Sequence, residues 1–397
     1  MTPAARLAAA IEILDRQRAG EPAEKALTLW ARTHRFAGSG DRAAIRDHVF
    51  AALRAPRSQG ARGGGSQDGR ASGRQLVLGG LVAAGIDPDT LFTGEGHAPA
   101  ALTPAERASL DAVPAELPEA VALDCPDWLA GPLRDSLGTG FAPVMALLRE
   151  RAPVFARANL ARGPREAAIA ALEAEGIAAH PHPLAATAIE LTGNAARLRT
   201  AAPYLDGRVE LQDAASQAVV EMLPLPAGGE ILDYCAGGGG KALAMAARGA
   251  ARLTAHDIDA GRMRDLPERA RRAGARIALA RPGSLGGRRF DLVLADVPCS
   301  GSGSWRRAPE AKWTLTPARL AELTALQAEI LDEVAALVRP GGVLGYATCS
   351  MLEAENGAQV AAFLARRPGW RLEAERGFTP LDGGDGFYAA VLRAPAA

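Results

Sequence analysis

Short apolar runs alternate with longer amphipathic stretches through the second half of the chain. Helical spacing of apolar residues covers 241–248, 260–272 and 318–338. Between these stretches lie runs typical of buried strands, at 230–233, 253–256, 276–279, 290–295 and 343–348. Strands that alternate with helices form a mostly parallel, doubly wound sheet. We therefore predict an α/β domain over residues 206–397.

The first quarter of the chain shows helical spacing only, so we predict an all-α domain at 1–113. The Gly/Ser/Arg-rich stretch 56–72 interrupts it, and there we expect a mobile loop or a disordered insertion. The predicted helices lie at 4–18, 23–33, 41–53, 75–84 and 104–113.

A third, smaller unit follows the Pro/Glu-rich linker 114–118. It mixes short helices with strands, including a strand at 154–159 and a helix at 164–175. We predict a small α/β domain over residues 120–205.

Composition narrows the class of protein. Of the 397 residues, 48% are hydrophobic and 23% are charged, which is usual for a soluble globular protein. No apolar run reaches the roughly 18 residues of a membrane span, and the N-terminus begins an amphipathic pattern instead of an export signal. We expect a cytoplasmic monomer with no membrane partner. With four cysteines, no C-x-x-C pair and six scattered histidines, we also expect no metal site.

Charge is distributed unevenly although the net charge is zero. Residues 248–289 contain eleven arginines against four acids, and 54–74 contain five arginines against one. Such stripes suit a nucleic-acid backbone, or they are solvated helix faces. Only three lysines occur, and two of them, Lys241 and Lys312, fall inside the motifs described below.

Two cysteines follow predicted strands directly. Cys299 lies beyond the strand at 290–295, and Cys349 beyond the strand at 343–348. A free cysteine is most often a small buried hydrophobic residue. At the carboxyl ends of strands in an open α/β sheet, however, a thiol can serve as a nucleophile.

A glycine-rich turn joins the strand at 230–233 to the helix at 241–248. Gly237 to Gly240 allow close approach of a ligand, and the helix N-terminus offers amide donors. Asp257 lies twenty residues beyond Gly237, at the end of the next strand, where a carboxylate suits a ribose diol. The spacing fits NAD or S-adenosylmethionine.

Four motifs combine these features: Asp233-x-Cys235-Ala236-x-x-Gly239-Gly240-Lys241, Asp296-x-Pro298-Cys299-Ser300, Arg306-x-x-Pro309-x-x-Lys312-Trp313 and Ala347-Thr348-Cys349-Ser350. Together they resemble the Sun (Fmu-type) RNA cytosine-5 methyltransferases, in particular the bacterial small-subunit ribosomal RNA methyltransferase B type. Residues 153–159, 203–217 and 385–388 resemble further segments of that family. The resemblance implies a Rossmann-like methyltransferase sheet, an α/β RNA-binding unit and an all-α, NusB-like N-terminal domain.

The resemblance also implies roles for the motif residues. Cys349 would add to carbon 6 of cytosine, Cys299 would assist release of the methylated product, and Asp296 would contact the base. Lys241 and Lys312 would supply positive charge near the base, the cofactor or a phosphate. The partner would be RNA, with ribosomal RNA expected. The S-adenosylmethionine site would consist of Cys235, Ala236, Gly237, Gly238, Gly239, Gly240, Lys241, Asp257 and Asp296.

The chain departs from the family pattern at two places. Gly237-Gly238 stand where the family usually has Ala-Pro, and residues 279–284 offer no acid to contact adenine. Other functions therefore stay open: the same reaction on transfer RNA, and a non-catalytic RNA-binding or assembly factor. A DNA cytosine methyltransferase would use Cys299 as the nucleophile, and a dehydrogenase would use neither thiol.

Overall fold

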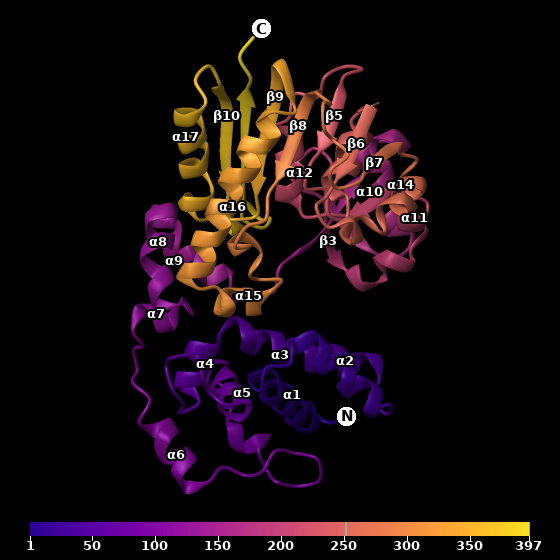
Figure 1. Ribbon diagram of the computed structural model, residues 1–397. Coiled ribbons are helices and arrows are strands. Elements are labelled where there is room, and N and C mark those ends of the chain that lie inside the picture. Colours follow the sequence, from indigo (N-terminus) through magenta and orange to yellow (C-terminus); the bar gives the residue numbers. More distant parts are fainter. Residues whose placement is uncertain (251, 397) are drawn as a thin grey trace. The chain divides into compact units, whose positions relative to one another are not determined.

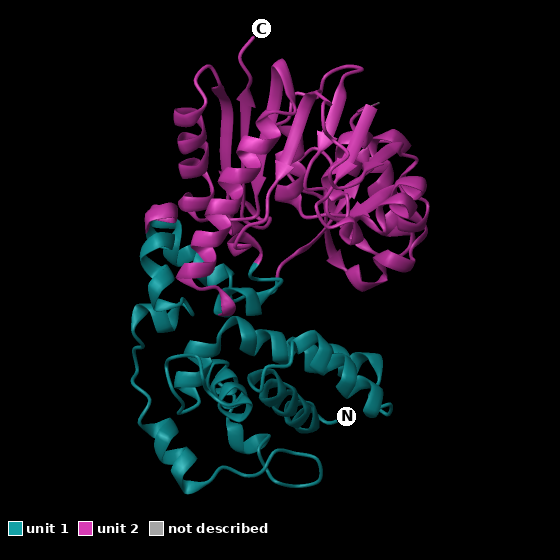
Figure 2. Cartoon of the chain, in the orientation of Figure 1, with its two compact units in different colours: residues 1–134, 139–151, 305–313 teal, residues 135–138, 152–304, 314–397 magenta. Residues whose placement is uncertain are grey.

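The computed structural model describes residues 1–250 and 252–396. They fold into two compact units (Figure 2). Unit 1 contains residues 1–134, 139–151 and 305–313, and unit 2 contains residues 135–138, 152–304 and 314–397. The late segment 305–313 is thus part of unit 1. The domain boundaries expected at 113, 120 and 205 stay a prediction.

Unit 2 is built on a large sheet with the strand order β10-β11-β9-β8-β5-β6-β7 (Figure 1). Strands β5 to β9 are parallel, while β10 and β11 pair antiparallel at one edge. This confirms the expected Rossmann-like α/β fold. The strands are β5 (Glu230–Asp233), β6 (Arg252–His256), β7 (Ile277–Ala280), β8 (Phe290–Asp296), β9 (Val338–Thr348), β10 (Arg371–Phe378) and β11 (Phe387–Arg393).

Helices cover both faces of the large sheet. Because successive strand residues point to opposite faces, Leu292 and Leu294 of β8 pack with α12 and α13, whereas Val293 and Ala295 pack with α16 and α17. The continuous apolar run of this strand follows from burial on both faces. The helices are α12 (Ala214–Glu221), α13 (Gly240–Ala247), α14 (Leu266–Ala273), α16 (Pro317–Ala335) and α17 (Gly357–Arg366). The helix expected over 260–272 is divided into a 3-10 turn, Ala260–Met263, and α14, which has Pro267 in its first turn.

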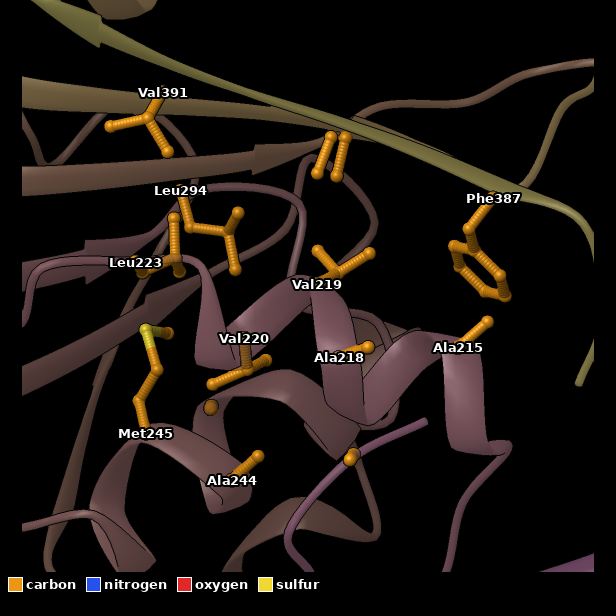
Figure 3. Close-up of a cluster of buried hydrophobic side chains, with 14 of the residues drawn as sticks. Ala215, Ala218, Val219, Val220, Leu223, Ala244, Met245, Leu294, Phe387 and Val391 are labelled. Atoms are coloured by element: carbon orange, nitrogen blue, oxygen red, sulfur yellow. The ribbon is translucent and has the colours of Figure 1, made fainter. Parts of the chain in front are cut away.

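A smaller antiparallel sheet of order β2-β3-β1-β4 belongs to the same unit. Phe155 and Ala188 from this sheet share one apolar core with the large sheet. In Figure 3, Val219 and Val220 of α12 lie among Met245 of α13, Leu294 of β8 and Val391 of β11. The strands of the small sheet are β1 (Val154–Ala158), β2 (Ala178–Pro181), β3 (Ala188–Gly193) and β4 (Val209–Leu211), and the helices of this segment are α10 (Arg165–Ala174) and α11 (Ala202–Leu205).

Polar contacts also join the small sheet to the large one. Arg157 of β1 is 2% exposed and donates to the carbonyl oxygen of Gly240 at 3.0 Å and to Gln212 Oε1 at 2.9 Å. Burial lowers the pKa of Arg157 to about 10. Asn159 Nδ2 donates to the carbonyl oxygen of Ala273 at 2.9 Å. The small sheet thereby reaches the first residue of α13, directly beside the glycine-rich turn.

Unit 1 is helical, with an apolar core that includes Ile13, Leu14, Trp30, Ile45 and Leu78. The predicted helices of the N-terminal region are present, while its likeness to NusB stays a prediction. The helices are α1 (Pro3–Arg18), α2 (Ala23–Thr33), α3 (Ser39–Arg54), α4 (Pro56–Arg62), α5 (Gly73–Ala83), α6 (Pro104–Asp111), α7 (Glu119–Ala122), α9 (Phe141–Leu147), most of α8 (Asp127–Leu137) and most of α15 (Pro309–Thr314).

The expectation of a mobile loop at 56–72 was wrong for residues 56–62, and it stays a prediction for the remainder. Residues Pro56–Arg62 form α4, which packs closely against α5. A β-carbon on Gly79 would lie 1.7 Å from the carbonyl oxygen of Gln59, and one on Gly63 would lie 1.9 Å from that of Gln75. The glycines therefore permit close helix packing, and sequence composition alone suggested flexibility instead.

This contact predicts opposite effects for two neighbouring substitutions. Gly79→Ala should destabilise unit 1 by about 1–3 kcal/mol, because the new methyl group meets backbone that must move. Gly80→Ala is the matched control: its methyl group would lie 3.5 Å from the Gln59 side chain, so the gain in helix propensity should stabilise by roughly 0.5–1 kcal/mol. Denaturant unfolding of the full chain measures both, and equal effects would contradict the packing explanation.

Candidate functional site

A cavity of about 490 Å³ opens at the carboxyl ends of β5, β8 and β9. It brings together most of the residues predicted from the motifs: Cys235, Ala236, Gly237, Gly238, Gly240, Lys241, Asp296, Cys299 and Cys349. Gly239 and Asp257 do not line it. The remaining lining residues are Gln212, Ser216, Asp233, Arg262, Val297, Pro298, Arg319 and Leu323.

The two thiols lie side by side. Asp296 of β8 pairs with Ala347 of β9, so each cysteine follows the same end of two adjacent parallel strands. The sulfur atoms of Cys299 and Cys349 are 3.3 Å apart. A hydrogen bond from Cys299 lowers the pKa of Cys349, and the positive Lys241 acts in the same direction against burial and Asp296. The same hydrogen bond, together with burial, raises the pKa of Cys299. Cys349 is therefore the more readily ionised thiol of the pair.

An ion pair lies beside the thiols. Lys241 Nζ of α13 is 2.7 Å from Asp296 Oδ2, and the ammonium also lies 5.0 Å from the centre of the Phe387 ring. Burial would lower the pKa of Lys241, but the pairing with Asp296 outweighs it, so the pKa is raised. The site therefore keeps a fixed positive charge close to Cys349.

Asp233, at the end of β5, is a buried carboxyl group that lines the cavity. It is 1% exposed and receives no hydrogen bond from any side chain among the described residues, while the backbone amide of Ala242 only partly offsets the rise in its pKa. Burial raises the pKa of Asp233 to about 7, and the negative charge of Asp296 adds to this effect. An unpartnered carboxyl group of this kind is suited to a cationic ligand.

Asp257 contacts the glycine-rich turn. It is 1% exposed, and its carboxylate accepts hydrogen bonds from the backbone amides of Gly237, at 2.9 Å, and Asp259, at 3.0 Å. Arg262 pairs with it at 3.2 Å. Asp257 therefore orders the glycine-rich turn, and its predicted contact with a ribose stays a prediction.

The buried carboxylate of Glu355 joins the loop that contains Cys299 to the loop that contains Cys349. It accepts hydrogen bonds from the Ser300 backbone amide at 2.8 Å and from the hydroxyl groups of Ser300 and Ser350. Gln327 Nε2 of α16 donates to it at 3.0 Å. Ser300 and Ser350 directly follow the two cysteines, so Glu355 sets the positions of both loops. The motifs did not include Glu355, and only its place soon after Ser350 could have indicated it.

A second close contact brings in the segment 385–388. A β-carbon on Gly303 would lie 1.9 Å from the carbonyl oxygen of Gly386, and the Gly386 amide donates to Gly303 O at 2.9 Å. Gly303 in turn donates to the carbonyl oxygen of Cys349 at 3.0 Å. The loops after β8 and β9 and the start of β11 thus form one hydrogen-bonded layer.

The expectation that Lys312 supplies charge at the site was wrong. Lys312 is 1% exposed inside unit 1, where Nζ donates to the carbonyl oxygen of Asp124 at 2.7 Å. Burial lowers the pKa of Lys312 to about 8. Trp313 of the same motif donates to the carbonyl oxygen of Leu53 at 3.0 Å. This motif stabilises the packing of unit 1.

Comparison with known proteins identifies the family. Residues 220–393 match the 16S rRNA methyltransferase RsmB/F family, and residues 125–196 match the ferredoxin-like domain of RsmF/B-like methyltransferases. Over 288 residues the chain is 34% identical to ribosomal RNA small subunit methyltransferase B of Salmonella arizonae. The matched region covers 67% of this chain and 66% of that protein. The chain belongs to the RsmB/F (Sun/Fmu) family.

Other relatives agree with this assignment. The RsmB/F-family chain is 34% identical over 283 residues to the enzyme of the same name from Serratia proteamaculans, and again it spans 66% of the relative. Among solved structures, PH0851 has a TM-score of 0.75 over 99% of both chains at 22% identity. NSun6 from Pyrococcus horikoshii, solved with SFG, has a TM-score of 0.61 over 68% of this chain and 99% of that one at 18% identity. These structures support the fold.

Two classes of feature are missing from the described residues, 1–250 and 252–396. None of their helices is both long and apolar enough to cross a membrane. They also contain no group of three or more His, Cys, Asp or Glu side chains that could hold a metal ion.

The position of Glu355 predicts a change in thiol reactivity. The hydrogen bond between the thiols and their burial have the largest effects on the pKa values of Cys299 and Cys349. The negative charge of Glu355 has a smaller effect and raises the pKa of both thiols. Glu355→Gln keeps the size of the side chain and removes that charge, so alkylation of Cys349 by iodoacetamide should reach half its maximal rate at a lower pH. The exposed Glu353 offers the control, since Glu353→Gln removes the same charge two residues away. A profile that moves to higher pH, or moves equally in both variants, would contradict this role.

Proposed function

We propose that this chain transfers a methyl group from S-adenosylmethionine to carbon 5 of cytosine in RNA, through a covalent bond between Cys349 and the base. The observation that carries the proposal is the pair of thiols 3.3 Å apart beside the Lys241–Asp296 ion pair. Membership of the RsmB/F family supports small-subunit ribosomal RNA as the substrate. Because free thiols persist in a reducing compartment, we propose that the reaction takes place in the cytoplasm.

The cavity fits the proposed cofactor. Asp233 offers an unpartnered carboxyl group for the ammonium group of the cofactor's amino-acid part. The glycine-rich turn leaves room against the backbone of Gly237 and Gly238. The N-terminus of α13 favours the negative carboxylate of the same part. When bound, S-adenosylmethionine supplies an electrophilic methyl group.

Cys349 overcomes the low reactivity of carbon 5. Its thiolate forms a bond to carbon 6 of cytosine, so that the electron pair of the ring double bond becomes available at carbon 5 to take the methyl group. Asp296 is placed to hydrogen-bond the edge of the ring, and Lys241 stabilises the negative charge of the thiolate. Loss of the carbon-5 proton then restores the double bond and expels Cys349. We propose that Cys299 assists this release.

The base must leave any stacked or paired structure to reach the thiols, because they lie within the cavity. The chain therefore requires a cytosine that is unpaired or turned out of its helix. Transfer RNA offers such cytosines too, and the experiment below separates the two substrates.

Substitution of each thiol tests the proposal. With labelled S-adenosylmethionine and unmodified small-subunit ribosomal RNA, the wild-type chain should produce 5-methylcytidine. Cys349→Ala should abolish both the product and any protein–RNA adduct, whereas Cys299→Ala should accumulate an adduct that survives denaturing electrophoresis. Cys125→Ala removes a buried thiol of unit 1 and should leave both measurements unchanged.

Three outcomes would contradict parts of this proposal. An adduct that persists in Cys349→Ala and disappears in Cys299→Ala would assign the nucleophile to Cys299. Label found only in transfer RNA would show that transfer RNA, and not ribosomal RNA, is the substrate. No label in either RNA, with no cofactor bound, would favour a non-catalytic RNA-binding protein.

The raised pKa of Asp233 predicts that cofactor affinity depends on pH. An ammonium group binds the ionised carboxylate, and with a pKa of about 7 only roughly one-tenth of the free protein is ionised there at pH 6. Affinity for S-adenosylmethionine should therefore rise about five- to tenfold from pH 6.0 to 7.5, with a proton released on binding. Calorimetry in two buffers of different ionisation enthalpy measures both effects. Asp233→Asn should bind more weakly and without this rise, and an equal rise in both proteins would refute the role of Asp233.

A further inference from the structure

One connection in the large sheet has no helix. α13 follows β5, α14 follows β6 and α16 follows β8, but the residues between β7 and β8, 281–289, contain no helix in the described structure. The edge strand β7 is correspondingly open, with Leu279 45% exposed and Ala278 also exposed. Arg252, Arg271, Arg276 and Arg288, from the arginine-rich part of the sequence, lie at this open part of the sheet.

A groove of about 670 Å³ occupies this place. We call it the arginine groove. Four arginines and a single carboxylate, Glu230, are the charged residues that line it. The groove is lined by Glu230, Arg252, Leu253, Thr254, Pro267, Ala270, Arg271, Ala275, Arg276, Ile277, Ala278 and Arg288.

The arginines of this region fall into a paired and an unpaired group. Arg262 pairs with Asp257, Arg271 pairs with Glu268, and both Arg269 and Arg272 pair with Glu210. By contrast, Arg276, Arg281, Arg288 and Arg289 have no carboxylate within ion-pair distance among the described residues. The excess positive charge noted in the sequence therefore collects at the groove and in the loop beside it.

Arg288 is fixed in the groove by neutral groups. Its Nη2 donates to Thr254 Oγ1 at 3.2 Å, and its guanidinium carbon lies 4.7 Å from the centre of the Phe290 ring. Neither partner cancels the charge, and further N–H groups of the guanidinium are available. An arginine held in this way is suited to bind a phosphate.

Arginines from the same stretch of the chain line both the catalytic cavity and the groove. Arg262 lines the cavity, α14 begins soon afterwards, and Arg271 near the end of α14 lines the groove. An eight-residue helix is about 12 Å long, a span that a few nucleotides can cover. A strand leaving the cavity along α14 would meet the unpaired arginines.

We propose that the arginine groove binds the phosphate backbone of the same RNA whose target cytosine enters the cavity. The inference rests on the proposed function. Charge complementarity selects RNA as the occupant, because two of the lining arginines have no carboxylate partner and the loop adds two more. Contacts of this kind position the RNA, while the cavity recognises the base.

The test compares two double variants that remove equal charge from opposite edges of the large sheet. Arg276→Ala/Arg288→Ala removes the two lining arginines that have no carboxylate partner. Arg371→Ala/Arg376→Ala on β10 is the matched control, in which Arg376 also lies over an aromatic ring, that of Phe378. Binding of unmodified small-subunit ribosomal RNA is measured by filter retention over a range of salt concentrations, alongside affinity for S-adenosylmethionine and the melting temperature.

The groove variant should bind RNA more weakly, and its plot of log affinity against log salt should be less steep by about 1.4, as expected for two lost contacts to single-stranded phosphates. KM for RNA should rise while kcat and cofactor affinity stay unchanged. The control should match the wild type. If the groove variant melts earlier, Arg276→Ala alone provides the test, with half the change in slope.

Two results would overturn the inference. Unchanged RNA affinity and salt dependence in the groove variant would show that the groove does not bind the phosphate backbone of this RNA. Equal losses in both double variants would show that only overall charge matters. Neither result affects the proposed function, which fails only if the wild-type chain does not methylate RNA.

Discussion

The parallel pairing of β8 with β9 is the constraint on which the site depends. Adjacent parallel strands end at the same edge, so the register that places Asp296 opposite Ala347 also brings Cys299 and Cys349 to a separation of 3.3 Å. Strand pairing alone does not hold two loops at that distance. The buried Glu355 does so by accepting hydrogen bonds from the residue after each cysteine. The carboxylate lies in an apolar interior and is retained because its donors compensate for its desolvation.

Charge within the cavity is balanced so that each group changes the behaviour of its neighbour. Lys241 keeps its proton because Asp296 pairs with it, and its charge in turn lowers the pKa of Cys349. Asp233 has no such partner, and burial keeps its pKa near neutrality. Asp296 is thus committed to holding the charged Lys241 beside Cys349, while Asp233 remains free for a ligand. The same residue type performs two tasks because the local environments differ.

Sequence reasoning identified the sheet and most of the cavity for a physical reason. Buried parallel strands appear as continuous apolar runs, and their carboxyl ends converge, so Cys299, Cys349 and Lys241 could be expected together. It failed where function depends on contacts distant in sequence. The burial of Lys312 in unit 1 and the tie made by Glu355 are set by tertiary hydrogen bonds. At Gly63, composition indicated flexibility, whereas the structure uses the missing side chain for close packing against α5.

The two ends of the central strands differ in charge, and this difference matches the chemistry proposed for them. At the carboxyl end, Asp233 and Asp296 line the cavity together with Lys241, Arg262 and Arg319, so neither sign of charge dominates. At the other end, Arg276 and Arg288 face a groove with one carboxylate. A cavity with balanced charge adds little attraction for a polyanion, so positive charge outside the cavity must supply it. Arg276 and Arg288 supply that charge without lining the cavity, so Cys349 keeps the local potential that its lowered pKa requires.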